Sequence, residues 1–203
     1  MYVPHLNAVD ESTARDLVAA YGAGELVTAG EDGYPLSTLL PVVWHESTVI
    51  AHMARANAQW RTISSGTKAL LVVGGPQAYV SPSWYAAKAE HGRVVPTWNY
   101  SSVHLTGRVT VVDDPEWLRP VVTELTDRHE AGLPSPWAVT DAPADFVDKM
   151  LRAIVGLSFE VERVEAKAKL SQNRSEADRL GVINGLGDDP VAAAMRAALG
   201  RYS

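Results

Sequence analysis

Residues 156–164, GLSFEVERV, alternate between apolar and polar side chains. Leu157, Phe159 and Val161 take one set of positions, and Ser158 and the glutamates take the other. Because successive side chains of a β-strand point to opposite faces, this period of two predicts a half-buried antiparallel strand. The fold therefore has to contain a sheet with one face covered.

Several other short runs have the same character. The runs 24–29 and 36–44 are separated by GEDGYP, a cluster of turn-forming residues, and together they predict a β-hairpin. Pro41 lies inside the second run and is expected at a sheet edge or a bulge, since proline cannot donate to a strand ladder. Further strands are expected at Thr48–Ala54, 69–74 and 103–112.

Helical patterns lie between these runs. One is expected at Glu11–Tyr21, ended by Gly22, and another at 114–130, with Asp114 as its N-cap. A third is expected from the cap Asp141 to Gly156, with a buried stripe of Phe146, Met150 and Ile154. Because helices and strands do not alternate regularly, the pattern favours a mainly β or α+β fold over a doubly wound parallel sheet.

The size and composition of the chain predict one globular domain over residues 1–203, with 175–203 as a small C-terminal helical appendage. The chain has 203 residues, of which 46% are hydrophobic and 21% charged. It has no cysteine, which excludes disulfides and thiolate chemistry. The sequence has no export signal and no apolar run long enough to cross a bilayer, so a cytoplasmic protein is expected.

The stretch HMARANAQW, His52 to Trp60, is the strongest candidate site. If the strand ending at Ala54 leads directly into a helix at about residues 57–65, Asn57 caps that helix and its first amides face outward. Arg55 could then bind a phosphate by its planar fork, and Lys68 could add a second charge. The alternative is that Arg55 is a surface residue and Asn57 only a cap.

Two further segments carry polar or aromatic groups in loop-like sequence. SPSWY and PTWNY contain Trp84, Tyr85, Trp98 and Tyr100, which indicate either a planar ligand or a partner subunit, or else a satellite core beneath a loop. KLSQNR, Lys169 to Arg174, offers two amides beside basic residues. Its alternative is a solvated connection to a helix capped by Asn173 or Ser175.

Several other chemistries are not expected. The six histidines lack metal-ligand spacing, and the sequence has no nucleophile elbow, no phosphate-binding Walker loop and no dinucleotide fingerprint in the right context. The C-terminal segment resembles a pair of short helices, but from 174 to 201 four arginines face four acids. Direct DNA binding is therefore doubtful, and a packing role is favoured.

Seven motifs together resemble the PaiB family of FMN-binding transcriptional regulators: YVPHL, HMARANAQW, GPQAYVSPSWY, VPTWNYSSVHLTG, DDPEWL, LTDRHE and KLSQNRSEADRLGVINGL. The resemblance covers nearly the whole chain. It implies a six-stranded antiparallel split β-barrel with peripheral helices, a homodimer with FMN at the subunit interface, and negative regulation of transcription linked to protease synthesis and sporulation. Ala58 stands where the family commonly has proline, and Ala166 where it commonly has glycine.

Given FMN as the cofactor, the candidate residues acquire roles. The phosphate suits Arg55, Asn57 and Lys68, with Thr38 as a further donor. The isoalloxazine would lie along the barrel, next to His52, with one face covered by Trp60 or Trp98. Its pyrimidine edge would meet one or more of the polar groups Asn99, Lys169, Gln172 and Asn173.

Three functions remain open at this point. The first is a flavin-binding regulator, the second a flavin-dependent oxidoreductase that transfers hydride through FMN, and the third a structural dimer with an empty site. The resemblance favours the first.

Overall fold

The computed structural model describes residues 1–199, which divide into two compact units. The barrel unit contains residues 15–73 and 104–164, and the helical unit contains 1–14, 74–103 and 165–199. The expected single domain over 1–203 stays a prediction, and the last four residues of the expected appendage lie outside the described part of the chain.

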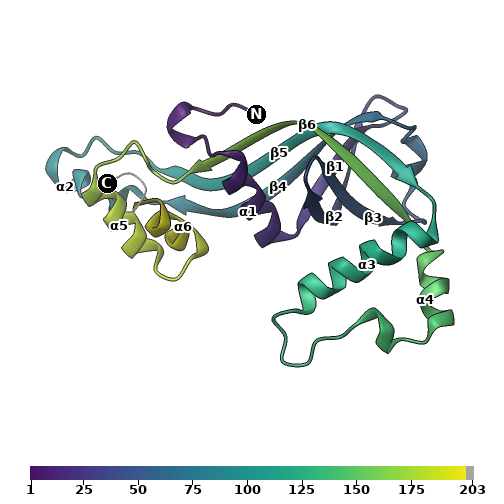
Figure 1. Ribbon diagram of the computed structural model, residues 1–203. Coiled ribbons are helices and arrows are strands. Elements are labelled where there is room, and N and C mark those ends of the chain that lie inside the picture. Colours follow the sequence, from purple (N-terminus) through teal and green to yellow (C-terminus); the bar gives the residue numbers. More distant parts are fainter. Residues whose placement is uncertain (200–203) are drawn as a thin grey trace. The chain divides into compact units, whose positions relative to one another are not determined.

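Six strands form a closed barrel in the order β1-β2-β3-β6-β5-β4 (Figure 1). The ladders of β1 with β2 and β4, of β2 with β3, and of β3 with β6 are antiparallel. Every expected strand is present, and the last three extend well beyond the predicted runs. The strands are β1 Ala23–Ala29, β2 Pro35–His45, β3 Thr48–Ala54, β4 Thr67–Val80, β5 Thr97–Val112 and β6 Ile154–Lys169.

The interior of the barrel is filled by its own side chains. Alternate residues of the strands point inward, including Val42, Val49 and Leu157, each at most 1% exposed. The space left among them is about 10 Å³, roughly the room of one water molecule. A flavin ring therefore has to bind outside the barrel.

Pro41 does not lie on an edge strand, because β2 pairs with both β1 and β3. That part of the prediction is wrong. Pro41 pairs with Ala23 at the end of the β1 ladder, and the β3 ladder starts at the next residue, Val42 opposite Ala51. The missing N–H therefore falls where one ladder ends and the next begins.

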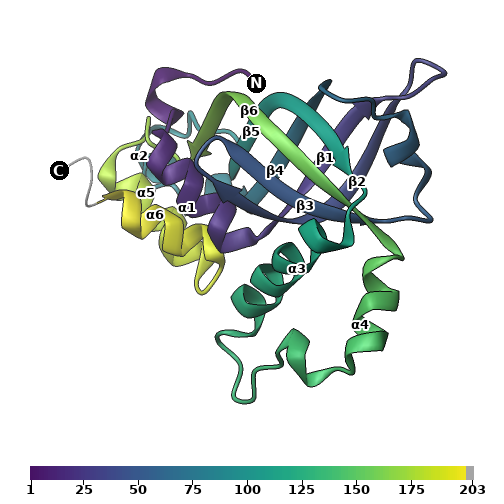
Figure 2. The same cartoon turned by 45° about the vertical axis from the view of Figure 1, so that its right-hand side comes forward.

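Helices α3 (Pro115–Glu130) and α4 (Ala144–Leu151) lie between β5 and β6 in the chain and outside the barrel (Figure 2). Asp114 caps α3 as predicted, with its carboxylate accepting from the Glu116 N–H at 2.9 Å. Val121 and Leu125 of α3 pack on Val43, which points outward from β2. Leu118 of α3 is buried against α4.

The predicted stripe of α4 is wrong. Val147 and Leu151 are its buried residues, whereas Phe146 and Met150 are 52% and 41% exposed. Its N-cap is Pro143, and Asp141 instead closes the short 3-10 turn η4 (Val139–Asp141). Ile154, the third predicted stripe residue, begins β6. The sequence pattern correctly predicted a helix with an apolar stripe. Which apolar side chains of that helix are buried is decided by the position of α3.

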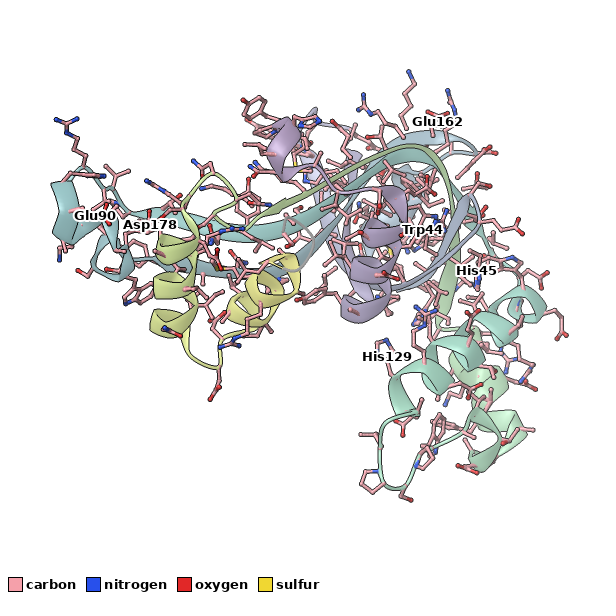
Figure 3. All side chains as sticks on the ribbon, turned by 60° about the vertical axis from the view of Figure 1, so that its left-hand side comes forward. Trp44, His45, Glu90, His129, Glu162 and Asp178 are labelled. Atoms are coloured by element: carbon pink, nitrogen blue, oxygen red, sulfur yellow. The ribbon has the colours of Figure 1, made fainter. Side chains whose placement is uncertain are left out.

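Helix α1 (Glu11–Tyr21) ends at Gly22, as expected, with φ of +63°. The left-handed backbone at Gly22 favours glycine, and a Cβ there would lie 2.8 Å from the His129 ring of α3, which would have to move aside. Two neighbouring residues of β2, Trp44 and His45, are labelled in Figure 3. His45 contacts Glu124 at 2.9 Å, and the Arg15 guanidinium lies 4.0 Å from the Trp44 ring centre.

The helical unit is built around α5 (Glu176–Leu186) and α6 (Pro190–Leu199), with the short α2 (Ala87–His91) and the 3-10 turn η3 (Pro82–Trp84). Ser175 caps α5. The buried Asp178 of α5 accepts the Ala87 N–H at 2.9 Å (Figure 3). Remaining short elements are η1 (His5–Asn7) and η2 (Ala58–Thr62).

Trp84 and Tyr85 belong to the core of the helical unit. Tyr85 is 3% exposed and packs with Val182 and Met195, and a Cβ at Gly185 would lie 2.4 Å from the Trp84 ring. The satellite-core alternative is thus correct for this aromatic pair. None of the helices within residues 1–199 has the length and apolar character needed to span a bilayer.

Candidate functional site

The stretch after β3 forms a short 3-10 helix, η2, in place of the longer helix expected at 57–65. Asn57 is its N-cap, as predicted, and accepts the Gln59 N–H at 2.9 Å. The helix ends after Thr62 because Ile63 is already extended and donates its N–H to the Trp60 carbonyl. The predicted cap is confirmed, and the predicted helix length is wrong.

Gln59 joins η2 to the first hairpin. Its side chain is 3% exposed and donates to the carbonyls of Leu26 and Leu36, at 3.1 and 3.3 Å, and to the Thr28 hydroxyl at 3.0 Å. Its carbonyl accepts from the Thr38 hydroxyl. One buried amide therefore fixes the end of the barrel across β1 and β2.

Thr38 and Asn57 are part of the same internal network. The Thr38 hydroxyl gives its proton to Gln59 and accepts the Asn57 side-chain N–H at 2.9 Å. A hydroxyl has one proton to donate, so Thr38 can donate to a phosphate only by giving up Gln59. Asn57 keeps one side-chain N–H that no contact within the network uses.

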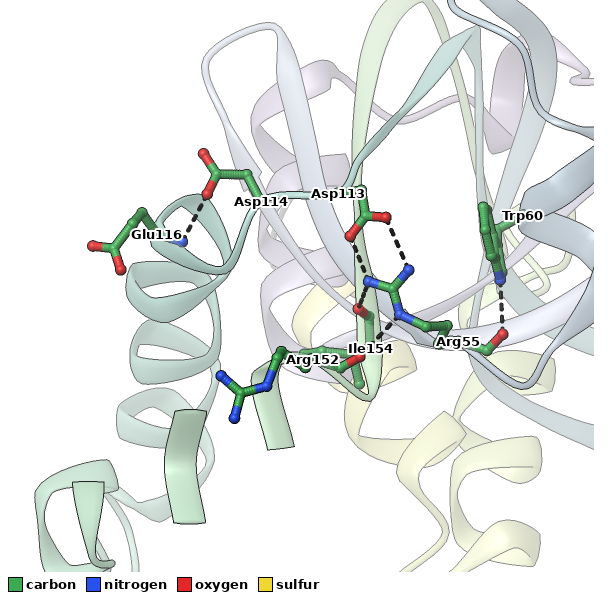
Figure 4. A network of polar contacts seen from close by, with 7 residues as sticks. All are labelled: Arg55, Trp60, Asp113, Asp114, Glu116, Arg152 and Ile154. Atoms are coloured by element: carbon green, nitrogen blue, oxygen red, sulfur yellow. Dashed lines mark hydrogen bonds and ion pairs between the residues drawn. The ribbon is translucent and has the colours of Figure 1, made fainter. Parts of the chain in front are cut away.

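Arg55 is held by four hydrogen bonds at the start of the α4–β6 connection (Figure 4). Its Nε donates to the Arg152 carbonyl at 2.9 Å, and Nη2 donates to the Ile154 carbonyl at 3.2 Å. Nη1 donates to Asp113 at 2.8 Å and Nη2 to the other Asp113 oxygen, which gives a bidentate pair. The guanidinium fork is therefore used within the chain.

This pair stabilises the charged form of both side chains. Hydrogen bonding from Arg55 lowers the pKa of Asp113, and hydrogen bonding to Asp113 raises the pKa of Arg55. The side chains are 36% and 52% exposed, so water and salt reach the pair. Another anion can therefore compete for the same guanidinium.

Trp60 lies beside this ion pair. Its indole N–H donates to the Arg55 carbonyl at 2.9 Å (Figure 4). The guanidinium carbons of Arg61 and Arg55 lie 5.1 and 5.9 Å from its ring centre. Arg55, Trp60, Arg61 and Asp113 are called the Arg55 corner below.

The other two predicted residues of the barrel unit lie elsewhere. Lys68 of β4 is exposed and lines a shallow depression with residues of β1 and the β1–β2 turn. His52 points outward from β3 into a cavity beside α3 and α4. Its Nδ1 is buried without a hydrogen-bond partner, and burial lowers the pKa of its imidazole.

The predicted residues of the helical unit make their own set of contacts. Asn99 is fully buried and donates to the Ser171 hydroxyl at 3.0 Å, so its amide is used inside the unit. Lys169 donates to the Trp98 carbonyl at 2.8 Å, and Gln172 bonds to the backbone of Ala168 and Leu170. Asn173 is exposed.

Trp98 is 48% exposed, and its indole N–H donates to Gln77 at 3.2 Å. Its ring meets Tyr79, which is also half exposed, edge to face with centres 6.5 Å apart. Of the two predicted aromatic clusters, this is the one that keeps ring surface open to solvent.

Sequence reasoning missed three residues of the site: Gln59, Arg61 and Asp113. Gln59 stands two residues after the cap within the stretch already singled out. Asp113 directly precedes Asp114, the cap of α3. Because one aspartate is enough to cap the helix, the presence of Asp113 was a signal that it has a separate role. Its partner, 58 residues earlier, could not be identified from spacing.

Comparison with known proteins identifies the family. Residues 1–163 match the family described as "Putative FMN-binding domain". The chain belongs to this family. Protease synthase and sporulation protein PAI 2 of Bacillus subtilis is 32% identical over 191 residues, covering 92% of this chain and 89% of that protein. The suspected PaiB resemblance and the choice of FMN as cofactor are therefore confirmed.

Solved structures support the same fold. The FAD and heme binding protein from Mycobacterium smegmatis matches with a TM-score of 0.63 at 16% identity, covering 87% of this chain and 79% of that chain. The flavocytochrome Anf3 from Azotobacter vinelandii matches with a TM-score of 0.56 at 19% identity, covering 88% and 78%. At these identities the likeness is one of fold alone.

The residues of the barrel unit can be compared with what FMN requires. Two guanidiniums flank Trp60, and Asn57 has a spare N–H, so the donors at the Arg55 corner suit a phosphate. Asp113, however, holds the fork of Arg55, and Lys68 lines a separate depression. The donor groups at the Arg55 corner fit a phosphate, provided that the phosphate replaces Asp113 as the partner of Arg55.

Proposed function

We propose that the protein is an FMN-binding regulator of the PaiB type that acts as a cytoplasmic homodimer. In this proposal the barrel is a split barrel of the flavin-reductase and pyridoxamine-phosphate-oxidase type, and FMN lies outside it at the subunit interface. The observation that carries the proposal is the Arg55 corner: a solvent-accessible guanidinium, already formed into a bidentate fork by a carboxylate, in a chain of the FMN-binding family.

Arg55 has a specific part in this proposal. Asp113 presents two oxygens to the fork, and a phosphate presents the same geometry with more negative charge. Exchange of one for the other would leave the bonds to the Arg152 and Ile154 carbonyls in place, so Arg55 would stay oriented. Arg61 and the spare N–H of Asn57 would add donors, and Trp60 would offer an aromatic face.

Three predicted cofactor residues of the helical unit, Trp98, Lys169 and Gln172, stay part of the proposal as ring contacts. Trp98 presents accessible ring surface, and Lys169 and Gln172 would have to exchange present bonds to reach a flavin edge. Bound FMN would supply a redox-active ring, and these side chains would only orient it and exclude water. His52 faces the apolar cavity beside α3 and α4 and is not assigned to the flavin.

Regulation is preferred to catalysis because the curated Bacillus subtilis relative is named for protease synthesis and sporulation. Direct DNA contact is not part of the proposal. The buried side of α6 is Val191, Ala192 and Met195, and its exposed side carries two alanines and Arg196, which donates to the Gly187 carbonyl. Such a face has few groups able to reach base edges. Control through a protein partner or through metabolism fits better.

The experiment is a titration of the purified protein with FMN, followed by quenching of flavin fluorescence. Wild type is expected to bind one FMN per chain, and Arg55→Ala is expected to bind about ten- to a hundredfold more weakly, because charge-assisted bonds to the phosphate are lost. Arg108→Ala is the matched control, since Arg108 forms a similarly exposed pair with Glu162 at 2.7 Å.

Equal affinity in wild type and Arg55→Ala would remove the corner from the flavin site. No binding by the wild type at saturating FMN would remove the proposed function altogether. The oxidoreductase alternative is tested on the same flavin-loaded protein: steady NAD(P)H oxidation with an electron acceptor would favour an enzyme over a regulator.

A further inference from the structure

The barrel unit contains a second candidate site, a cavity beside α3 and α4. Its volume is about 310 Å³, at the lower end of the range for small-molecule sites. It is lined by Val122 and Thr126 of α3, by α4 and the segment before it, and by His52 of β3. All of these residues belong to one compact unit.

The rim of this cavity is apolar and open to solvent. Phe146 and Met150 of α4 are 52% and 41% exposed, and Trp137 of the preceding segment is 46% exposed. Helix α4 therefore has two apolar faces, one packed against α3 and one turned to the cavity mouth. A contiguous apolar rim around a hollow is a feature of ligand sites more than of an ordinary surface.

His52 is the one ionisable side chain among the described residues that line the cavity. Its Nδ1 is buried and has no hydrogen-bond partner. A buried nitrogen without a partner is better left as a bare lone pair than as an unpaired N–H, so the neutral ring carries its proton on Nε2. The cavity then has one imidazole donor set in an apolar wall.

We propose that this cavity binds a small, uncharged, largely apolar molecule whose single hydrogen-bond acceptor receives the Nε2 proton of His52. The lining contains no lysine, arginine or acid, so a charged or phosphorylated ligand would lose its hydration without compensation. The pyrimidine edge of a flavin, with several donors and acceptors, would likewise find few partners there. The site is therefore separate from the one proposed for FMN, and its test does not depend on flavin binding.

The probe is 6-propionyl-2-(dimethylamino)naphthalene, an uncharged aromatic ketone whose emission shifts to the blue in apolar surroundings. Wild type is expected to produce a saturable blue shift with one site per chain. Ala142→Phe, which fills the cavity from its lining, is expected to abolish the shift. Leu39→Ala is the control, since Leu39 is an exposed apolar residue of β2 outside the cavity lining.

The hydrogen bond is tested from both sides. His52→Phe keeps a ring but removes the donor, and it is expected to weaken the ketone about five- to tenfold. The analogue without the ketone, 2-(dimethylamino)naphthalene, is expected to bind wild type and His52→Phe equally. With the wild-type protein alone, the ketone is expected to bind more tightly than the analogue, so the comparison survives if a variant fails to fold.

Three outcomes would overturn the proposal. The first is no saturable blue shift with wild type, and the second is unchanged binding in Ala142→Phe. The third is displacement of the ketone by one equivalent of FMN, which would show that the cavity belongs to the flavin site. Flavin affinity is measured separately by fluorescence quenching, so loss of probe binding with normal FMN binding would refute only this second site.

Discussion

Arg55 and Arg108 are both exposed arginines paired with a carboxylate, yet their surroundings differ. Arg55 makes two additional bonds to backbone carbonyls and lies beside Trp60, whereas Arg108 makes one additional bond, to the Gly66 carbonyl. The extra bonds fix the direction of the Arg55 fork. A fixed fork loses less entropy when it binds an anion, which is the reason for proposing the phosphate site at the Arg55 corner and not at Arg108.

The first prediction concerns Asp113. Asp113→Asn removes the charge that competes for Arg55, so FMN is expected to bind about two- to fivefold more tightly than to wild type. The measurement is the same fluorescence titration, with Glu162→Gln as control. If Asp113→Asn weakens binding, the carboxylate supports the site and does not compete for it.

The second prediction concerns the pH dependence of stability at His52. Burial lowers the pKa of His52 below the value of 6.5 expected in the unfolded chain, so the unfolded state binds the proton more readily. The free energy of unfolding is therefore expected to be highest above pH 6.5 and to fall as the pH drops from 6.5 towards the folded-state pKa. Below that pKa, this contribution becomes constant.

Urea unfolding at several pH values checks this expectation. His52→Gln lacks the titrating ring, so its free energy of unfolding is expected to fall less between pH 7 and pH 5 than that of wild type. Parallel curves for the two proteins would mean that His52 takes up its proton as easily in the folded state as in the unfolded one.

At the scale of elements, η2 is the piece that sequence reasoning described least well. Its cap was predictable because Asn57 directly follows a strand and asparagine is a preferred N-cap. Its length was not, because the segment is held by one long-range amide, Gln59, bonded to residues more than twenty positions away. Local propensity carries no information about such a bond.

The third prediction tests that amide. Gln59→Ala leaves the Thr28 and Thr38 hydroxyls and two carbonyls of the hairpin without their partner, so the free energy of unfolding is expected to fall by about 1–3 kcal/mol. Urea denaturation measures the loss. Gln77→Ala, an exposed glutamine, is the control and is expected to change stability by less than about 0.5 kcal/mol. Equal losses of unfolding free energy in the two variants would show that the buried network stabilises the protein no more than an exposed glutamine does.

The strands and helix α3, in contrast to η2, were predictable from local sequence signals. Alternation at 156–164, the turn cluster before β2 and the Asp-Pro start of α3 each act within a few residues, and each prediction is confirmed. The prediction of the buried face of α4 failed because two sets of its residues are apolar. Only the position of α3 decides which set is buried. For the same reason Asp113 was missed: it follows β5, Arg55 follows β3, and the two meet because these strands lie on either side of β6.

At the scale of the whole molecule, the family, the barrel and the cofactor are established, whereas the assembly is proposed. Two observations support the proposal that a second copy completes the flavin site: side chains fill the barrel, and Asp113 holds the fork of Arg55. A second copy could supply the missing contacts, as the resemblance to the PaiB family implied.

The fourth prediction is therefore an assembly. Sedimentation equilibrium is expected to give about twice the chain mass of 21.9 kDa, with one FMN per chain. If FMN lies at the interface, adding it should shift the dissociation of the dimer to lower protein concentration. A monomer that binds FMN with full affinity would place the whole site within one chain and contradict the shared arrangement.

The interior void of about 10 Å³ has one more consequence. Since side chains fill the centre of the barrel, the strands form a frame whose interior packing does not depend on a bound ligand. Residues 113–153, which leave the frame after β5 and return at β6, supply most of the lining of the cavity beside α3 and α4. Substitutions at these lining residues would change what the cavity accepts, while the interior packing of the barrel stays as it is.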